Sequence, residues 1–167
     1  MDLTAQLENE LKQLVGFAAS TPRRVEMTSP AGLVLSVDFL AVDKMSCALE
    51  SLTLHVPALV GREVSVLHQW ADNLSKHVTY LLESIEPIEI DDSGHQVLIR
   101  SNPPDLSQGA TQFYEVLLSA QANGTFLLKR YRTESGQPGR ESVDILLTNQ
   151  TLKKLVNDLV DTIPETN

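Results

Sequence analysis

The sequence predicts an α+β protein in which helices pack on one face of one or more antiparallel sheets. Three observations predict this class. Strand-like runs come in groups before each of two helix-like runs, which gives the order β-β-β-α twice. An amphipathic segment with helical spacing precedes the first group. The helices are too few, and come too late after the strands, for a doubly wound parallel sheet, in which strands and helices alternate.

Residues 1–20 predict an amphipathic helix. Its leucines recur at a 4-4-3 spacing, which places them on one helical face: Leu3, Leu7, Leu11 and Leu14. Gly16 is a suitable C-terminal stop, and Pro22 prevents continuation soon afterwards. Because an isolated helix of about 12–15 residues is marginal in water, we expect this helix to dock on the body of the protein or on a partner.

Residues 21–82 predict the first β-β-β-α group. Strand patterns run over residues 23–57, with a turn at residues 29–32. Residues 63–82 then predict a helix, because apolar side chains recur at 3-4-4-3 and form a core-facing stripe: Leu67, Trp70, Leu74, Val78 and Leu81.

Residues 83–167 predict the second group with an extra hairpin. The hairpin covers residues 85–101, and a polar loop begins at residues 102–105, where two prolines cannot continue a ladder. A second hairpin turns at Asn123-Gly124, and a strand covers residues 142–147. Thr148 or Asn149 can cap the last helix, whose apolar face is broad: Leu152, Leu155, Val156, Leu159, Val160 and Ile163.

The two groups align with each other as a tandem repeat. Residues 50–54 match residues 141–145, and superposing Gly32 on Gly124 places Phe39 on Tyr131. Duplication is one explanation. The other is that burial imposes the same apolar spacing on any two segments of this type. Either way, a chain of 167 residues suits one compact unit, which we divide into a helix at 1–20 and halves at 21–82 and 83–167.

The composition narrows the classes of function. The net charge is −9 and the pI about 4.8, which disfavours binding to nucleic acid or to an anionic membrane. Cys47 is the single cysteine, so no internal disulfide can form. The N-terminal segment lacks the basic start and apolar run of a signal peptide, and no stretch approaches the roughly 20 apolar residues of a membrane span. We therefore expect a cytoplasmic protein without a membrane association.

The sequence predicts no catalytic residue, no metal ligand and no cofactor. His68 and His77 lie close to opposite faces of one predicted helix, and no Cys or His pair has ligand spacing. Phosphate-binding glycine loops and the Gly-x-Ser-x-Gly elbow are missing from the sequence. The acidic hairpin has the character of a solvated turn and lacks the ligand spacing of a calcium loop: Glu83, Glu86, Glu89, Asp91 and Asp92.

One basic strand offers the candidate binding residues Lys129, Arg130, Tyr131 and Arg132, with Arg140 across the next loop. Alternation along a strand puts Arg130 and Arg132 on one face and Lys129 and Tyr131 on the other. Such a strand could grip a phosphate or carboxylate. The alternative, which we favour, is that the arginines form cross-strand pairs with carboxylates: Glu115, Glu134 or Glu141.

Three functional hypotheses follow. The leading one is a non-enzymatic cytoplasmic interaction module, an adaptor or chaperone-like protein that binds another polypeptide or a second copy of itself. Self-association would use the N-terminal helix or an open sheet edge. The second hypothesis is binding of single-stranded nucleic acid through residues 129–132. The third is a small ligand-binding protein or enzyme with its site between the two halves.

Overall fold

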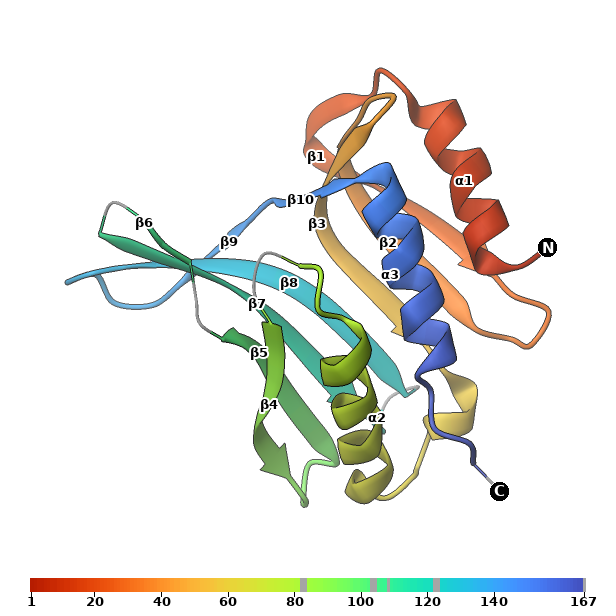
Figure 1. Cartoon of the computed structure of the whole chain (residues 1–167), viewed down its shortest axis with the longest axis vertical. Helices are drawn as coiled ribbons and strands as arrows, with labels where there is room; N and C mark the ends of the chain where they lie inside the picture. Colours follow the sequence, from red (N-terminus) through yellow and green to blue (C-terminus); the bar gives the residue numbers. More distant parts are fainter. Residues whose placement is uncertain (82–83, 103–104, 108, 122–123, 167) are drawn as a thin grey trace.

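The computed structural model describes residues 1–81, 84–102, 105–107, 109–121 and 124–166. Its helices are α1 (Leu3–Leu14), α2 (Val64–His77) and α3 (Asn149–Asp161), with a short 3-10 helix η1 (Pro57–Leu59) before α2. The strands, shown in Figure 1, are β1 (Ala18–Thr28), β2 (Val34–Val42), β3 (Ser46–His55), β4 (Ser84–Asp91), β5 (Gln96–Asn102), β6 (Asp105–Ser107), β7 (Ala110–Ser119), β8 (Thr125–Glu134), β9 (Glu141–Val143) and β10 (Ile145–Thr148).

All of these strands belong to one sheet with the order β1-β2-β3-β8-β7-β5-β4. Every strand pairing in it is antiparallel: β10 pairs with β3, β6 with β7 and β9 with β8 in addition to the main path. The three α-helices lie together on one side of the sheet (Figure 1). The predicted α+β class, with helices on one face of an antiparallel sheet, is confirmed, and both sequence halves contribute to the same sheet.

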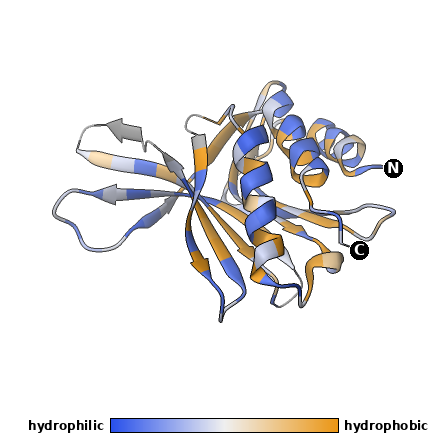
Figure 2. Ribbon diagram, turned by 60° about the horizontal axis from the view of Figure 1, so that its bottom comes forward, coloured by the Kyte–Doolittle hydropathy of each residue, from blue (hydrophilic) through white to orange (hydrophobic). Residues whose placement is uncertain are grey.

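The centre of the sheet divides at β3 and β8. The C-terminal half of β3 pairs with β8, from Leu52 opposite Leu128 to His55 opposite Thr125, whereas its N-terminal half pairs with β10. The far half of β8 pairs with β9. Residues 141–148 therefore cross from β8 to β3. The ends of β7 and β8, together with β6 and β9, project beyond the helices as an arm (Figure 1). In this arm the ends of β7, β8 and β9 are more hydrophilic than the strands beneath the helices (Figure 2).

The core lies between the helices and the sheet. The leucines of α1 are buried, and α1 packs against α3, β1 and β2, so the N-terminal helix docks on the body of the protein. The stripe predicted for residues 67–81 is also buried in full. At its centre the Trp70 ring lies 6.0 Å from that of Phe126, and its Nε1–H donates to Thr162 Oγ1 at 3.1 Å.

Four local predictions need correction. The helix predicted at 63–82 ends at His77, since the β-branched Val78 and Thr79 favour extended backbone. β1 begins at Ala18, because a register break before Arg23 accommodates Pro22. The strand predicted at 142–147 is two strands, and the polar loop contains β6.

Thr148 is the N-cap of α3, as expected. Asn123, predicted in a hairpin turn, and Glu83, predicted in the acidic hairpin, lie outside the described residues.

The order of elements is compatible with the repeat, but the register of one strand is not. β1-β2-β3-α2 has three strands where β7-β8-β9-β10-α3 has four, because the last strand is interrupted between Val143 and Ile145. However, Phe39 faces the core, while Tyr131 lies on the opposite side of the sheet from the buried Leu128 and Arg130. Because a shift of one residue exchanges the faces of a strand, β2 and β8 do not correspond in the register that superposes Gly32 on Gly124.

No helix in the described part of the chain combines the length and apolarity needed to cross a membrane.

Candidate functional site

The basic strand predicted as a binding site is β8, and its arginines are engaged by neighbouring side chains. Arg132 Nη1 lies 2.5 Å from a carboxylate oxygen of Glu134 and 3.1 Å from one of Glu141. Arg130 is buried, its Nε donates to Gln112 Oε1 at 3.3 Å, and its guanidinium lies 4.3 Å from the Tyr114 ring centroid. The carboxylate pairing favoured from the sequence is confirmed for Arg132.

The other candidate residues lie on the opposite, helix-free face around Glu115. One oxygen of this carboxylate, Oε2, accepts from Arg140 Nη1 at 2.6 Å and from Arg100 Nη2 at 3.1 Å. Lys129 stands directly opposite Glu115 in the β7–β8 register. Three cationic side chains therefore surround Glu115, whose side chain is only 11% exposed. We call Arg100, Glu115, Lys129 and Arg140 the Glu115 cluster.

Aromatic rings hold two guanidinium groups of this cluster in place. The Arg140 guanidinium lies 3.8 Å from the Tyr131 centroid, and that of Arg100 lies 4.8 Å from the Phe113 centroid. The two rings contact each other at 6.0 Å. Sequence reasoning found Lys129, Tyr131 and Arg140 but missed Arg100 and Phe113, because only the pairing of β5, β7 and β8 brings them together.

A second polar cluster lies on the same face at Asp38. Arg24 donates to its two carboxylate oxygens through Nε at 2.8 Å and Nη2 at 2.9 Å, and Ser51 Oγ donates to Oδ2 at 2.9 Å. The hydrogen bonds from Arg24 hold the pKa of Asp38 below its usual range, although burial raises it. The hydrogen bond from Ser51 and the charge of Lys129 also lower this pKa.

The two clusters belong to one cross-strand row of alternating charge. Arg24, Asp38 and Ser51 are successive partners across β1, β2 and β3. Across β8, β7, β5 and β4 the row continues in this order: Lys129, Glu115, Arg100 and Glu86. Opposite charges on neighbouring strands stabilise a sheet, so most of this row is explained by folding.

We expect Asp38→Asn to lower the free energy of unfolding by about 1–2 kcal/mol at neutral pH, since charge-assisted hydrogen bonds are lost. The folded pKa of Asp38 is depressed, so its contribution is present above the unfolded value of about 3.9 and is lost as the pH falls through the folded value. Urea denaturation at several pH values measures this. Asp92→Asn, in an exposed turn, is the control; a deficit for Asp38→Asn that persists unchanged in acid would contradict the assignment.

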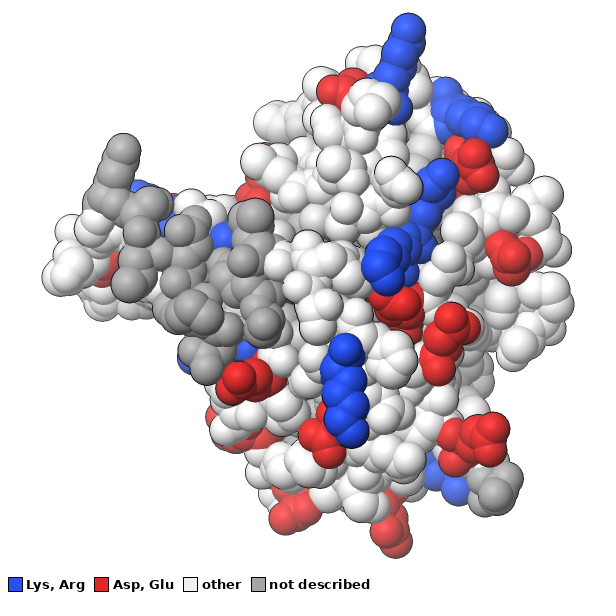
Figure 3. Space-filling model, viewed as in Figure 1, with Lys and Arg blue, Asp and Glu red and all other residues white. Residues whose placement is uncertain are grey.

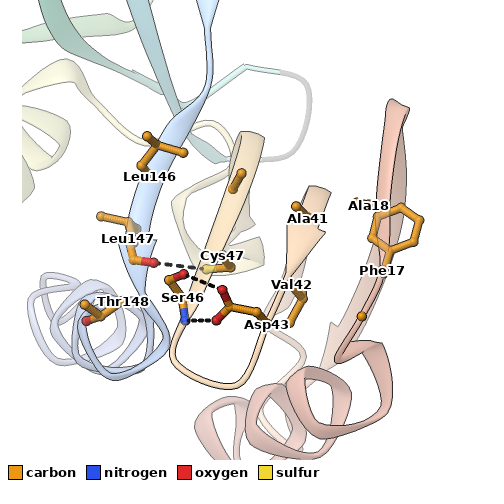
Figure 4. A pocket seen from close by; sticks show the side chains of 12 residues that line it. Phe17, Ala18, Ala41, Val42, Asp43, Ser46, Cys47, Leu146, Leu147 and Thr148 are labelled. Carbon is orange, nitrogen blue, oxygen red and sulfur yellow. Dashed lines mark hydrogen bonds between the residues drawn. The ribbon is translucent and has the colours of Figure 1, made fainter.

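An apolar hollow of about 590 Å³ opens on the same face, where β1, β2, β3 and β10 lie side by side (Figure 4). Its floor is a cross-strand row of small residues, Ala18, Ala41 and Ala48, and Leu146 completes the row on β10. Leu146 is 70% exposed. Phe17 lines the hollow from the β1 side. We call this feature the β10 hollow.

The polar groups of the β10 hollow are occupied within the protein. Asp43 accepts from the backbone N–H groups of Met45 and Ser46 and from Ser46 Oγ, and these bonds lower the pKa of Asp43. The Cys47 thiol is buried and donates to Leu147 O at 3.7 Å. Burial and then the Asp43 charge raise the pKa of Cys47 to about 12, so this thiol is not an activated nucleophile.

Within the described residues no group of three or more His, Cys, Asp or Glu side chains is arranged to hold a metal ion. In the acidic hairpin, Asp91 accepts from Ser93 Oγ and Gly94 N–H, as in a solvated turn. On the helix side of the molecule, acidic and basic side chains are intermingled (Figure 3).

Comparisons of the chain with protein-family models, with curated proteins and with solved structures found no match.

Proposed function

We propose that this protein is a cytoplasmic, non-enzymatic adaptor or chaperone-like module that binds another polypeptide through the helix-free face of its sheet. The observation that carries the proposal is the β10 hollow. It combines an exposed leucine with a floor of three alanines on the one sheet face that no described helix covers. Contiguous apolar surface is characteristic of interaction sites, and the hollow places Leu146, the alanines and Phe17 side by side on this face.

The chemistry of the hollow favours a polypeptide over a small ligand. Small-molecule sites place a few free polar groups to orient the ligand, whereas Asp43 and Ser46 are bonded to each other here. The floor spans four neighbouring strands, about 14 Å at the usual spacing between strands. That width accommodates a helix of about 10 Å diameter with its side chains.

The alternatives of a helix-mediated or edge-mediated contact have less support. α1, which needed a docking surface, finds one on α3, β1 and β2. β1 and β4, the two end strands of the main strand order, carry devices that discourage further pairing at their outer edges. β1 has Pro22 at a register break, and β4 has Pro87 at another, with acidic side chains alongside. A face-on contact uses the outer edge of neither of these two strands.

The partner segment is expected to combine an apolar side chain with an acidic one. Residues 142–146 link Ser142, which stands opposite Tyr131, to Leu146 at the hollow. Four extended residues span about 13 Å, and their even-numbered side chains point to the helix-free face. One segment could therefore place an apolar side chain in the hollow and a carboxylate near Arg140.

Photo-crosslinking tests the proposal. A benzophenone side chain at position 146 is compared, in native cells, with the same group at Val60, which is 50% exposed and lies beyond the opposite end of β3. We expect one defined protein to be crosslinked from position 146 and not from position 60. Ala48→Phe, which fills the floor, should abolish that crosslink. Equal capture from both positions would contradict the proposal.

A further inference from the structure

We propose that the Glu115 cluster is an anion-binding subsite that takes a carboxylate or phosphate group through Arg100 and Arg140. Only the source of the anion, an acidic side chain on the bound polypeptide, rests on the proposed function. The subsite itself is a property of four side chains on β5, β7, β8 and the loop before β9, and small anions can test it without the partner.

Positive charge exceeds negative charge at this point of an acidic protein. Arg100, Arg140 and Lys129 surround Glu115. Glu86 stands opposite Arg100 on the neighbouring strand. Even when Glu86 is counted, three cations face two carboxylates, whereas the whole chain has a net charge of −9. A further anion would balance the cluster.

The guanidinium groups also have donors to spare. An arginine has five N–H donors, and Arg100 and Arg140 each give one of them to Glu115 Oε2. Arg100 Nε is buried and has no hydrogen-bond partner among the described residues. The donors that a ligand can meet are therefore the remaining N–H groups of the two guanidinium groups, since the Arg100 side chain is 39% exposed and that of Arg140 40%.

The space beside the two arginines suits a small oxyanion. A cavity of about 480 Å³ is lined by Arg100 and Arg140, by Thr111 and Thr133, and by Phe113. Stacking on aromatic rings fixes the planes of the guanidinium groups, which leaves their N–H edges to meet carboxylate or phosphate oxygens. The threonine hydroxyls can donate to the same ligand.

The surroundings favour one anionic group over a polyanion. Glu134 and Glu141 pair with Arg132 close by, and Asp144 is exposed between the cluster and Leu146. These carboxylates would repel successive phosphates of a nucleic acid strand. A single acidic or phosphorylated side chain of a polypeptide meets the arginines without such repulsion, so we assign the subsite to that source.

Arginine Nε–H resonances in a ¹⁵N-labelled full-length chain test the subsite. Acetate and inorganic phosphate are titrated at constant ionic strength, with sodium chloride as the reference. We expect saturable millimolar shifts at Arg100 and Arg140 and none at the exposed Arg23. Larger affinity for acetate than for phosphate indicates a carboxylate site; the reverse indicates a phosphate site. Shifts that do not saturate, or that are equal at Arg23, would overturn the proposal.

Two substitutions separate this subsite from general charge effects. Arg140→Gln should weaken anion binding at least about tenfold, as expected for the loss of a charge-assisted contact, whereas the matched Arg23→Gln should not. Glu115→Gln should strengthen it, because an internal competitor is removed. If Arg140→Gln disturbs the fold, the anion affinity of the Glu115→Gln variant tests the proposal instead. Unchanged or weaker anion binding by that variant overturns the proposal. Crosslinking from position 146 is independent of these results, so the two proposals fail separately.

Discussion

Trp70→Ala is expected to lower the free energy of unfolding by about 3–5 kcal/mol, the range for truncating a large buried aromatic residue. Trp70 is fully buried in α2, contacts the Phe126 ring on β8 and donates a hydrogen bond to Thr162 after α3. It therefore joins two helices to the central sheet. A domain of ordinary stability has about 5–15 kcal/mol in total, so urea denaturation should show a large shift of the midpoint.

Trp70→Phe is the matched control for the hydrogen bond. It keeps an aromatic ring in the core but removes the Nε1–H donor, so we expect a smaller loss of about 1–2 kcal/mol. A loss below about 1 kcal/mol for Trp70→Ala would contradict the central position of this side chain, because truncating a buried aromatic residue lowers the free energy of unfolding by more than that.

Leu7→Ala is expected to cost about 2–5 kcal/mol, the range for leucine in a close-packed core. Leu7 is fully buried at the centre of the α1 stripe, where the helix packs on α3 and the first two strands. Thr4 Oγ1 and Asn157 Oδ1 also form a hydrogen bond of 2.5 Å between α1 and α3. Loss of the leucine leaves a cavity between these elements.

Lys12→Ala is the control on the same helix, since Lys12 is exposed and forms a surface pair with Glu8 at 3.4 Å; its effect should stay within about 0.5 kcal/mol. A chain beginning at Thr21 lacks α1 and the first three residues of β1. It should be destabilised yet keep a monomer's mass in light scattering if α1 acts within one molecule. Equal stability of the full and shortened chains would show that α1 is not part of the core.

The sequence predicted those parts of the fold that follow from periodicity. The four leucines of α1 and the five apolar residues at 67–81 are buried as expected, because burial itself creates such spacing. The end of α2 was misplaced since Val78 and Leu81 continue the apolar pattern beyond the last helical turn. Their burial does not depend on helical backbone, so the pattern alone could not locate His77 as the end.

The candidate site was only half predictable for a related reason. The basic residues at 129–132 and Arg140 stand out in an acidic chain, but their partners depend on register. Glu115 could face several cations; only the pairing of β5, β7 and β8 selects Arg100 and Lys129. The β10 hollow was missed entirely, because its alanines have no marked local signal and Leu146 joins them from β10, a strand far along the chain.

The central claim, that the helix-free face around Leu146 receives another polypeptide, is tested most directly by mapping the crosslink from position 146. We predict one partner segment that carries an apolar side chain at the hollow and an acidic side chain about 13 Å from it, which is about nine residues along a helix. The crosslink should disappear with Ala48→Phe and should be lacking at position 60. A crosslink that survives Ala48→Phe, or that forms equally from position 60, would contradict the claim.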